Sequence, residues 1–228
     1  MSNKYTNVSE AERLGVAGYS RAGLAIYDAL VYGITSPYFW DCPGHILLAH
    51  YNRYISNNHL DVGVGTGYML DHCTFTSPSP RVCLLDLSPN PLAKTARRIA
   101  RYRPKTIQGS VLSPIPFDGE PFDSIGTNYM IHCVPGSIPE KAVLFDHLGA
   151  LLAPSGVIFG STVLGEGVPT NSRARRALPI LNQKGTFSNL RDNEADLRHA
   201  LEARFDDVSM RVVGMVALFS ARKRAAAK

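Results

Sequence analysis

The chain has 228 residues, of which 45% are hydrophobic and 19% charged, with a formal net charge of +5. These values exclude a disordered or fibrous chain and fit one globular domain with a substantial core. The pI near 9.1 permits nucleic-acid binding. However, lysines and arginines are scattered outside three short runs, so a nucleic-acid partner is not favoured.

The cysteines show no metal-binding or redox pattern. No two form a Cys-x-x-Cys pair, and none stands at metal-ligand spacing from a histidine, so we predict no metal site. They are Cys42, Cys73, Cys83 and Cys133. Because no charged-then-apolar leader and no membrane-length apolar run are present, we expect a cytoplasmic protein with free thiols and no membrane span.

The amino-terminal residues suggest short helices. Residues 1 to about 22 are polar and predict either a mobile arm or a first short helix, and Ser9 followed by Glu12 is a capping-box pattern for such a helix. A helical spacing of apolar residues runs from Leu24 to Tyr32, and Gly33 is predicted to end that helix.

A segment dense in aromatic residues and prolines, 35–44, leads into the next helix. Pro43-Gly44 is predicted to open a helix over 45–55. Its apolar stripe is expected to face the sheet and consists of Ile46, Leu47, Tyr51 and Tyr54.

The segment 59–70 predicts a strand, a glycine-rich turn and a helix. The strand ends at Asp61-Val62, the turn contains Gly63, Gly65 and Gly67, and the helix opens near Tyr68. A dinucleotide-binding fingerprint has its third glycine three residues after the second, which is position 68 in this chain. That position is Tyr68, so the sequence does not match the fingerprint. Asp61 would repel a phosphate but suits a ligand with an ammonium group, such as an amino acid.

A second acidic residue follows at the end of the next predicted strand. The apolar run 81–88 is typical of a buried parallel strand. Its carboxylate, Asp86, stands roughly twenty residues after the glycines, where an acidic side chain can accept hydrogen bonds from both hydroxyls of a ribose.

The remainder of the chain continues the alternation of strands and helices. The predicted elements are a helix over 91–101, strands over 106–111 and 121–128, a helix over 139–152, a turn at 154–156, a strand over 157–163, a loop and basic helix over 164–185, a helix over 194–204, and a hairpin over 208–221 with Gly214 at its turn.

Asp61, the Gly-x-Gly-x-Gly turn, Asp86 and the motif 151–156 before an apolar strand resemble class I S-adenosylmethionine-dependent methyltransferases. The resemblance extends from about residue 58 to about residue 222. It implies an α/β, Rossmann-like, doubly wound sheet of seven strands, mostly parallel with a C-terminal antiparallel hairpin and helices on both faces. Residues 56–228 would form the cofactor-binding core and residues 1–55 an N-terminal helical lid.

The resemblance also implies roles for single residues at the cofactor. Asp61 would hold the methionyl ammonium, Gly63, Gly65 and Gly67 would allow the backbone to approach, and Asp86 would bind the ribose. Leu87 would flank the adenine. The family commonly has an Asp for the adenine amino group where this chain has Ser110, which leaves the backbone at Val111 as a substitute. Asn128 would border the sulfonium methyl of S-adenosylmethionine, whose product is S-adenosylhomocysteine.

The acceptor side is predicted from aromatic residues and one histidine. Tyr27, Tyr38, Phe39 and Trp40 either wall a pocket for an apolar acceptor or pack the lid onto the core. His132 is the candidate general base for a hydroxyl acceptor and a candidate acceptor contact, its alternative being a histidine that packs or caps a turn.

The resemblance implies methyl transfer to a small molecule, with O-methylation favoured, C-methylation open and secondary metabolism as the expected setting, and the aromatic residues predict an aromatic or hydrophobic acceptor. Two alternatives remain. The basic run Arg173, Arg175 and Arg176 favours an RNA or protein methyltransferase, although the segment 128–131 lacks the Pro-Pro motif of nucleic-acid amino-methyltransferases. The second alternative is a protein that binds the cofactor but catalyses a reaction other than methyl transfer. The expected partner is a small-molecule acceptor, and the chain would be a monomer or homodimer.

Overall fold

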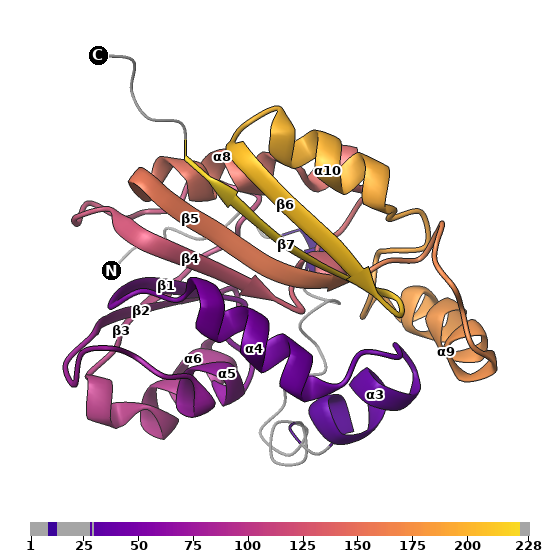
Figure 1. The fold of residues 1–228 in the computed structure, drawn as a ribbon, viewed down its shortest axis with the longest axis horizontal. Coiled ribbons are helices and arrows are strands. Elements are labelled where there is room, and N and C mark those ends of the chain that lie inside the picture. The colour runs from indigo at the N-terminus through magenta and orange to yellow at the C-terminus, as the bar shows by residue number, and fades with distance from the viewer. Residues whose placement is uncertain (1–8, 13–27, 29, 224–228) are drawn as a thin grey trace.

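A single seven-stranded sheet organises the chain in a computed structural model, which describes residues 9–12, 28 and 30–223 (Figure 1). The strand order is β3-β2-β1-β4-β5-β7-β6. The strands are β1 Asn58–Val62, β2 Arg81–Asp86, β3 Lys105–Gln108, β4 Phe122–Asn128, β5 Leu152–Val163, β6 Asp206–Val213 and β7 Val216–Arg222. The first five are parallel, whereas β7 is antiparallel to both β5 and β6. The predicted Rossmann-like sheet with a C-terminal hairpin is confirmed.

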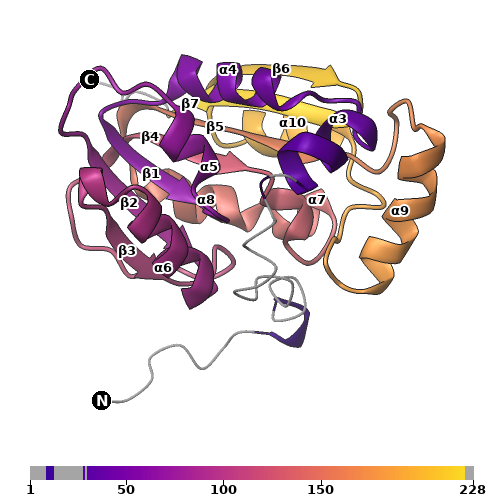
Figure 2. The same cartoon turned by 90° about the horizontal axis from the view of Figure 1, so that it is seen from below.

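Helices cover both faces of this sheet, as Figures 1 and 2 show. One face carries α4 Gly44–Tyr54, α5 Tyr68–His72 and α6 Pro89–Arg98. The other carries α7 Ile138–Lys141, α8 Val143–Ala150 and α10 Glu194–Glu202. The remaining elements are η1 Val31–Thr35, α3 Ser36–Tyr38, η2 Ala100–Tyr102, η3 Ile131–Cys133 and α9 Ser172–Gln183, the last of which stands at one end of the sheet.

Alternate residues of each central strand pack against opposite helical layers. On β2, Val82 and Leu84 belong to the core under α4, α5 and α6, whereas Cys83 and Leu85 belong to the core under α7, α8 and α10. A parallel strand that is buried on both faces needs such a continuous apolar run. The run therefore places the polar residue that ends it, Asp86, at the edge of the sheet.

Three sequence-based boundaries are wrong. Gly33 does not end the helix that precedes it, because its φ is not left-handed and helical turns continue through η1 and α3. The helical residues end instead at Tyr38, before a bend at Asp41, whose φ is +50°. Residues 24–27 and 29 lie outside the described residues.

The predicted helix over 139–152 is two helices, α7 and α8, joined at Ala142. The segment 154–156 is not a separate turn but part of β5, because Leu152 already pairs with Phe122 before an irregularity in the register.

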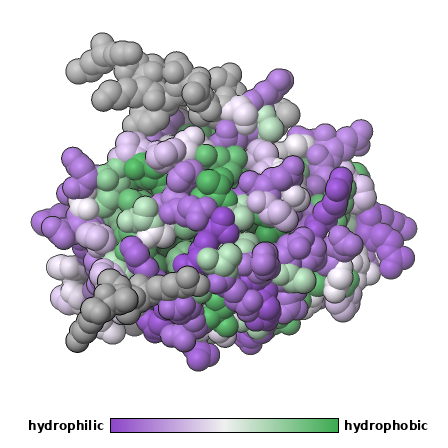
Figure 3. Space-filling view, turned by 90° about the horizontal axis from the view of Figure 1, so that it is seen from above, coloured by the Kyte–Doolittle hydropathy of each residue, from purple (hydrophilic) through white to green (hydrophobic). Residues whose placement is uncertain are grey.

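Within the described part of the chain, every helix is too short or too polar to cross a bilayer. Figure 3 shows one face on which apolar side chains form scattered patches among hydrophilic ones. Scattered apolar groups of this kind are usual on protein surfaces.

Candidate active site

The two predicted carboxylates lie on the same side of the sheet. Asp61 on β1 is paired with Leu84 of β2, and Asp86 follows Leu84 by two residues. Because side chains alternate with a period of two along a strand, both acids project toward the layer of α4, α5 and α6. Each is only 7% exposed. One ligand can therefore contact both.

The turn between β1 and α5 needs glycine at each of the three predicted positions. Gly63, Gly65 and Gly67 have φ values of +68°, +53° and +77°, a region that side chains with a Cβ avoid. A Cβ at Gly63 would also lie 2.4 Å from Cγ of Met130. The missing Cβ of Gly63 therefore leaves room for Met130, and the turn borders the two hollows described below through Gly63 and Gly65.

Asp86 lies in an environment that favours its protonated form. Burial raises the pKa of Asp86 from 3.8 to about 7, and the nearby charge of Asp61 acts in the same direction. Hydrogen bonds oppose this shift, including one of 2.8 Å from the Ser88 N–H to Oδ1. A neutral diol can share such a site without adding charge to it.

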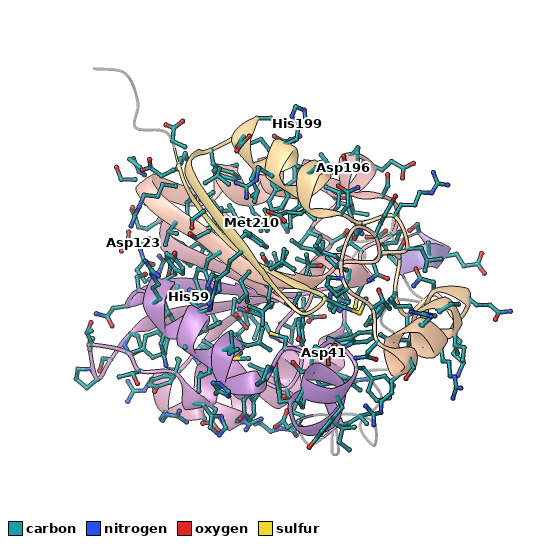
Figure 4. All side chains as sticks on the ribbon, turned by 45° about the vertical axis from the view of Figure 1, so that its right-hand side comes forward. Asp41, His59, Asp123, Asp196, His199 and Met210 are labelled. Carbon is teal, nitrogen blue, oxygen red and sulfur yellow. The ribbon has the colours of Figure 1, made fainter. Side chains whose placement is uncertain are left out.

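Asp61 is held by a chain of buried polar side chains. The Tyr51 hydroxyl on α4 donates to Asp61 Oδ1 at 2.9 Å and lies 2.9 Å from His59 Nε2. His59 Nδ1 lies 2.8 Å from the Ser124 hydroxyl, which lies 2.8 Å from the Ser56 hydroxyl. Tyr51, His59 and Ser124 are fully buried. In Figure 4, His59 lies inside the fold beside α4, whereas Asp123 and His199 lie at the surface.

A cleft with about 620 Å³ of empty space opens at the carboxyl ends of β1, β2, β3 and β4. Its lining includes the predicted cofactor residues Gly63, Asp86, Leu87, Ser110 and Val111. A second hollow of about 380 Å³ shares Gly63 with it. That hollow is lined by Tyr32, Asp61, Gly63, Val64, Gly65, Tyr68, Met69, Asn128 and Tyr129.

One residue that lines the second hollow, Asn128, has a buried polar atom without a partner in the described part of the chain. Asn128 Oδ1 accepts a hydrogen bond from the Ser161 hydroxyl at 3.1 Å. The amide nitrogen of Asn128 is buried and finds no hydrogen-bond partner among the described residues. An unpaired buried donor is costly, so this atom fits a ligand that supplies an acceptor. Gly67, in contrast, lines neither hollow, and a Cβ there would meet Thr95.

His132 is buried and neutral. Its ring lies 4.4 Å from the ring of Phe187 and 5.6 Å from that of Tyr129, measured between centroids. Burial and the nearby Lys141 lower the pKa of His132 to about 3. Its Nδ1 accepts from the Val163 N–H at 3.2 Å, so in the neutral ring the proton is on Nε2. These observations weigh against the predicted base role, which stays a prediction.

The predicted acceptor residues do not share one surface. Trp40 is 3% exposed and packs against Phe39 and Phe187, whereas Tyr38 is 57% exposed. Tyr27 lies outside the described residues. For Trp40 the packing agrees with the alternative that the aromatic residues attach the N-terminal helices to the core.

Several residues at the two hollows were missed by the sequence analysis. The ring of Tyr32 stacks on that of Tyr68 with centroids 4.3 Å apart, beside the glycine turn. Tyr129 has a φ of +52°, an unusual conformation for a residue with a side chain, which is found more often at functional sites. Met130 and Glu12 line the larger cleft. Local patterns do not reveal these contacts, because each depends on the tertiary fold.

Asp28 connects the N-terminal segment to the same turn. Its carboxylate accepts from the hydroxyl of Thr66, which lies between two of the glycines, and from Arg98 Nη1 at 2.5 Å. Arg98 also pairs with Asp71 at 2.8 Å. Asp28 therefore contacts both the glycine turn and α6.

Two carboxylates on one side of parallel strand ends, an open glycine turn and an unpaired amide together define an α/β protein that binds a nucleoside with a cationic amino-acid end. A family model described as a methyltransferase domain matches residues 60–158. Demethylluteothin O-methyltransferase of Streptomyces thioluteus is 42% identical over 207 residues, which cover 91% of this chain and 90% of that protein.

A second relative is the physcion biosynthesis cluster O-methyltransferase of Aspergillus chevalieri, 37% identical over 211 residues that cover 92% of this chain and 95% of that protein. A solved structure, the DhpI–SAH complex, has the same fold, with a TM-score of 0.67 at 18% identity, covering 96% of this chain and all of that one. The chain belongs to the S-adenosylmethionine-dependent methyltransferases.

Proposed function

We propose that this methyltransferase methylates an oxygen atom of a small hydrophobic acceptor in secondary metabolism. The names of the two relatives above, both O-methyltransferases that align over nearly the whole chain, support this assignment. The observation that carries the cofactor side is the placement of Asp61 and Asp86 on one side of the sheet, on either side of an open glycine turn. When bound, S-adenosylmethionine supplies an electrophilic methyl group on sulfur.

The residues of the two hollows would bind different parts of the cofactor. Asp61 would bind the ammonium group, and Tyr51 would fix the carboxylate for that contact. Asp86 would accept from the ribose hydroxyls, and Leu87 would pack on the adenine. The unpaired amide nitrogen of Asn128 would donate to the cofactor or to the acceptor. In-line methyl transfer needs alignment of donor and acceptor and exclusion of water above all, and these contacts would supply the alignment.

The acceptor hydroxyl is proposed to be an acidic one, such as an enol or a phenol with electron-withdrawing substituents. The reason is the state of His132: its Nδ1 accepts from the Val163 N–H, so the other ring nitrogen, Nε2, carries the proton. A neutral ring in that state can donate a hydrogen bond to an oxyanion but cannot remove a proton from a hydroxyl. An acceptor that ionises on its own needs no base.

The pH dependence of the rate tests this proposal. We expect kcat/KM to rise with pH through the pKa of the acceptor, and the inflection to move when an acceptor of different acidity is used. The variant His132→Ala should keep the same inflection at a lower rate. An inflection that stays constant across acceptors and disappears in His132→Ala would instead establish His132 as the base.

Product analysis separates the remaining possibilities. Mass spectrometry after incubation with methyl-labelled cofactor should show an O-methyl ether in a phenol or enol panel, and no label in RNA or protein. A C-methylated product, labelled macromolecule or unlabelled cyclised product would refute O-methylation. The N-terminal lid over 1–55, the acceptor contacts of Tyr27, Tyr38 and Trp40, the cytoplasmic location and a monomeric or homodimeric state stay part of the proposal.

A further inference from the structure

Glu12 places a third carboxylate in the larger cleft. It is 8% exposed and lines the cleft together with Asp86, Leu87, Ser110 and Val111. Its Oε1 accepts a hydrogen bond from the Ser110 hydroxyl, across 98 positions of sequence. The first described helical turn of the chain thus contacts the loop that follows β3.

A capping box fixes the orientation of this carboxylate. The backbone N–H and the hydroxyl of Ser9 each donate to Glu12 Oε2 at 2.9 Å, and the Glu12 N–H donates to the Ser9 hydroxyl at 3.2 Å. Oε2 therefore serves the helix, and Oε1 faces Ser110. A carboxylate oxygen accepts more than one hydrogen bond, so Oε1 has capacity for a further donor.

Two protein groups already engage the Ser110 hydroxyl. Its proton is donated to Glu12, and one of its two lone pairs accepts from the Leu112 N–H at 3.0 Å. Ser110 thus positions Glu12, and a carboxylate is a stronger acceptor than the hydroxyl that holds it.

The three carboxylates follow the order of groups in the cofactor. Asp61 is on β1 in the smaller hollow, Asp86 ends the neighbouring β2 in the larger one, and Glu12 is bonded to Ser110, which follows β3, the next strand of the sheet. The cofactor presents an ammonium group, then a ribose diol, then a purine with an exocyclic amino group. An amino group only donates in this setting, and a carboxylate only accepts, so the third pair is complementary.

On the cofactor site proposed above, we therefore propose that Glu12 accepts a hydrogen bond from the adenine amino group and selects adenine over its deaminated form. In hypoxanthine an oxygen replaces the amino group, so two acceptors would face each other. Hydrogen bonds to charged groups correspond to about 10- to 100-fold in affinity, and this is the discrimination we expect from Glu12.

The test compares two ligands by isothermal titration calorimetry: S-adenosylhomocysteine and S-inosylhomocysteine, its deaminated analogue. The quantity of interest is the ratio of their Kd values. In the full-length protein we expect this ratio to be at least about tenfold, and Glu12→Ala should reduce it toward unity. The double variant Glu12→Ala/Ser110→Asp supplies a carboxylate from the neighbouring position and should restore the ratio.

Two controls separate the carboxylate from the helix that carries it. Glu10→Ala removes an exposed charge from the same turn and should leave the ratio unchanged. Ser9→Ala breaks the capping box but keeps the Glu12 carboxylate. A ratio that stays high in Ser9→Ala supports the carboxylate as its source, whereas a ratio lost equally in Ser9→Ala and Glu12→Ala would overturn that conclusion.

Two further outcomes would refute the role of Glu12 while the cofactor site stands. One is an unchanged ratio in Glu12→Ala with normal binding of S-adenosylhomocysteine. The other is tighter binding of S-adenosylhomocysteine by Glu12→Ala, which would mean that Glu12 occupies the place of the adenine. Failure of the proposed site is distinct: S-adenosylhomocysteine would then bind equally well to the wild-type protein and to Asp86→Ala.

Discussion

Asp86→Asn should change the pH dependence of stability in a direction that is unusual for an aspartate. Burial raises the pKa of Asp86 to about 7 in the folded protein, while the unfolded chain has the ordinary value of 3.8. Between these values the folded state holds a proton that the unfolded state has lost. The free energy of unfolding therefore falls as the pH rises through this window.

The magnitude follows from linkage. Each pH unit inside the window costs the wild-type protein up to about 1.4 kcal/mol relative to a variant that stays neutral, which is about 3–5 °C in Tm for a domain of this size. The asparagine side chain of the variant cannot ionise and keeps the shape of the acid. The difference in Tm, variant minus wild type, should thus increase between pH 5 and pH 7 and level off above.

Differential scanning fluorimetry of both proteins without ligand measures this difference. Other buried groups also titrate: the pKa of His50 is lowered to about 4 and that of Asp192 raised to about 6, both by burial. They are common to both proteins and cancel in the difference. Asp71→Asn is the matched control, because the pKa of Asp71, which is paired with Arg98 and Arg101, is lowered and does not cross this range. A flat difference for Asp86→Asn would show that folded Asp86 is already ionised at pH 5.

Three further substitutions test the packing that supports the site. Tyr51→Phe removes the hydroxyl that contacts both Asp61 and His59. It should lower the free energy of unfolding in urea by about 1–3 kcal/mol and weaken the binding of S-adenosylhomocysteine. Tyr54→Phe on the same helix is the control and should have neither effect. Gly63→Ala should destabilise more than Gly167→Ala, because both have positive φ but only the first brings a Cβ into Met130; equal losses would assign the whole cost to φ. Lys141→Met leaves buried Asp192 without its 2.7 Å partner and should lower the free energy of unfolding by about 3–5 kcal/mol. The double variant Lys141→Met/Asp192→Leu should recover much of this loss. No recovery would mean that the lysine also stabilises the fold through its hydrogen bonds to backbone carbonyls.

The fold and the cofactor side of the site could be predicted because their signals are local. An apolar run that ends in an acid marks a buried strand and its tip, and alternation with a period of two then decides that Asp61 and Asp86 share a side. Residues other than glycine rarely adopt a positive φ, so a turn that requires it, such as the one at 63–67, is recognisable in the sequence by its glycines.

The rest of the site depends on contacts between distant residues. Ser9 and Glu12 were correctly predicted as a capping box, but the contact of Glu12 with Ser110 exists only in the folded chain. The position of His132 after β4 could be predicted, but its pKa could not, because desolvation by Phe187 and its neighbours sets that value. The helix end predicted at Gly33 is wrong because glycine permits a helix to end but does not require it to end.

The acids and the two hollows together explain how the site can orient a ligand that is cationic at one end and neutral along the rest. The Tyr51 hydroxyl donates to Asp61, a contact that suits a carboxylate, whereas burial and the proximity of Asp61 favour the protonated form of Asp86. Glu12 adds a further acceptor in the larger cleft, so the position of the acids alone does not distinguish the two ends of the ligand. The size of the two hollows does: the larger one, lined by Leu87, would accept the purine, and the smaller one, lined by Asp61, would accept the amino-acid end. The polar chain from Ser56 to Tyr51 would therefore position Asp61 for the ammonium group as well as stabilise the fold.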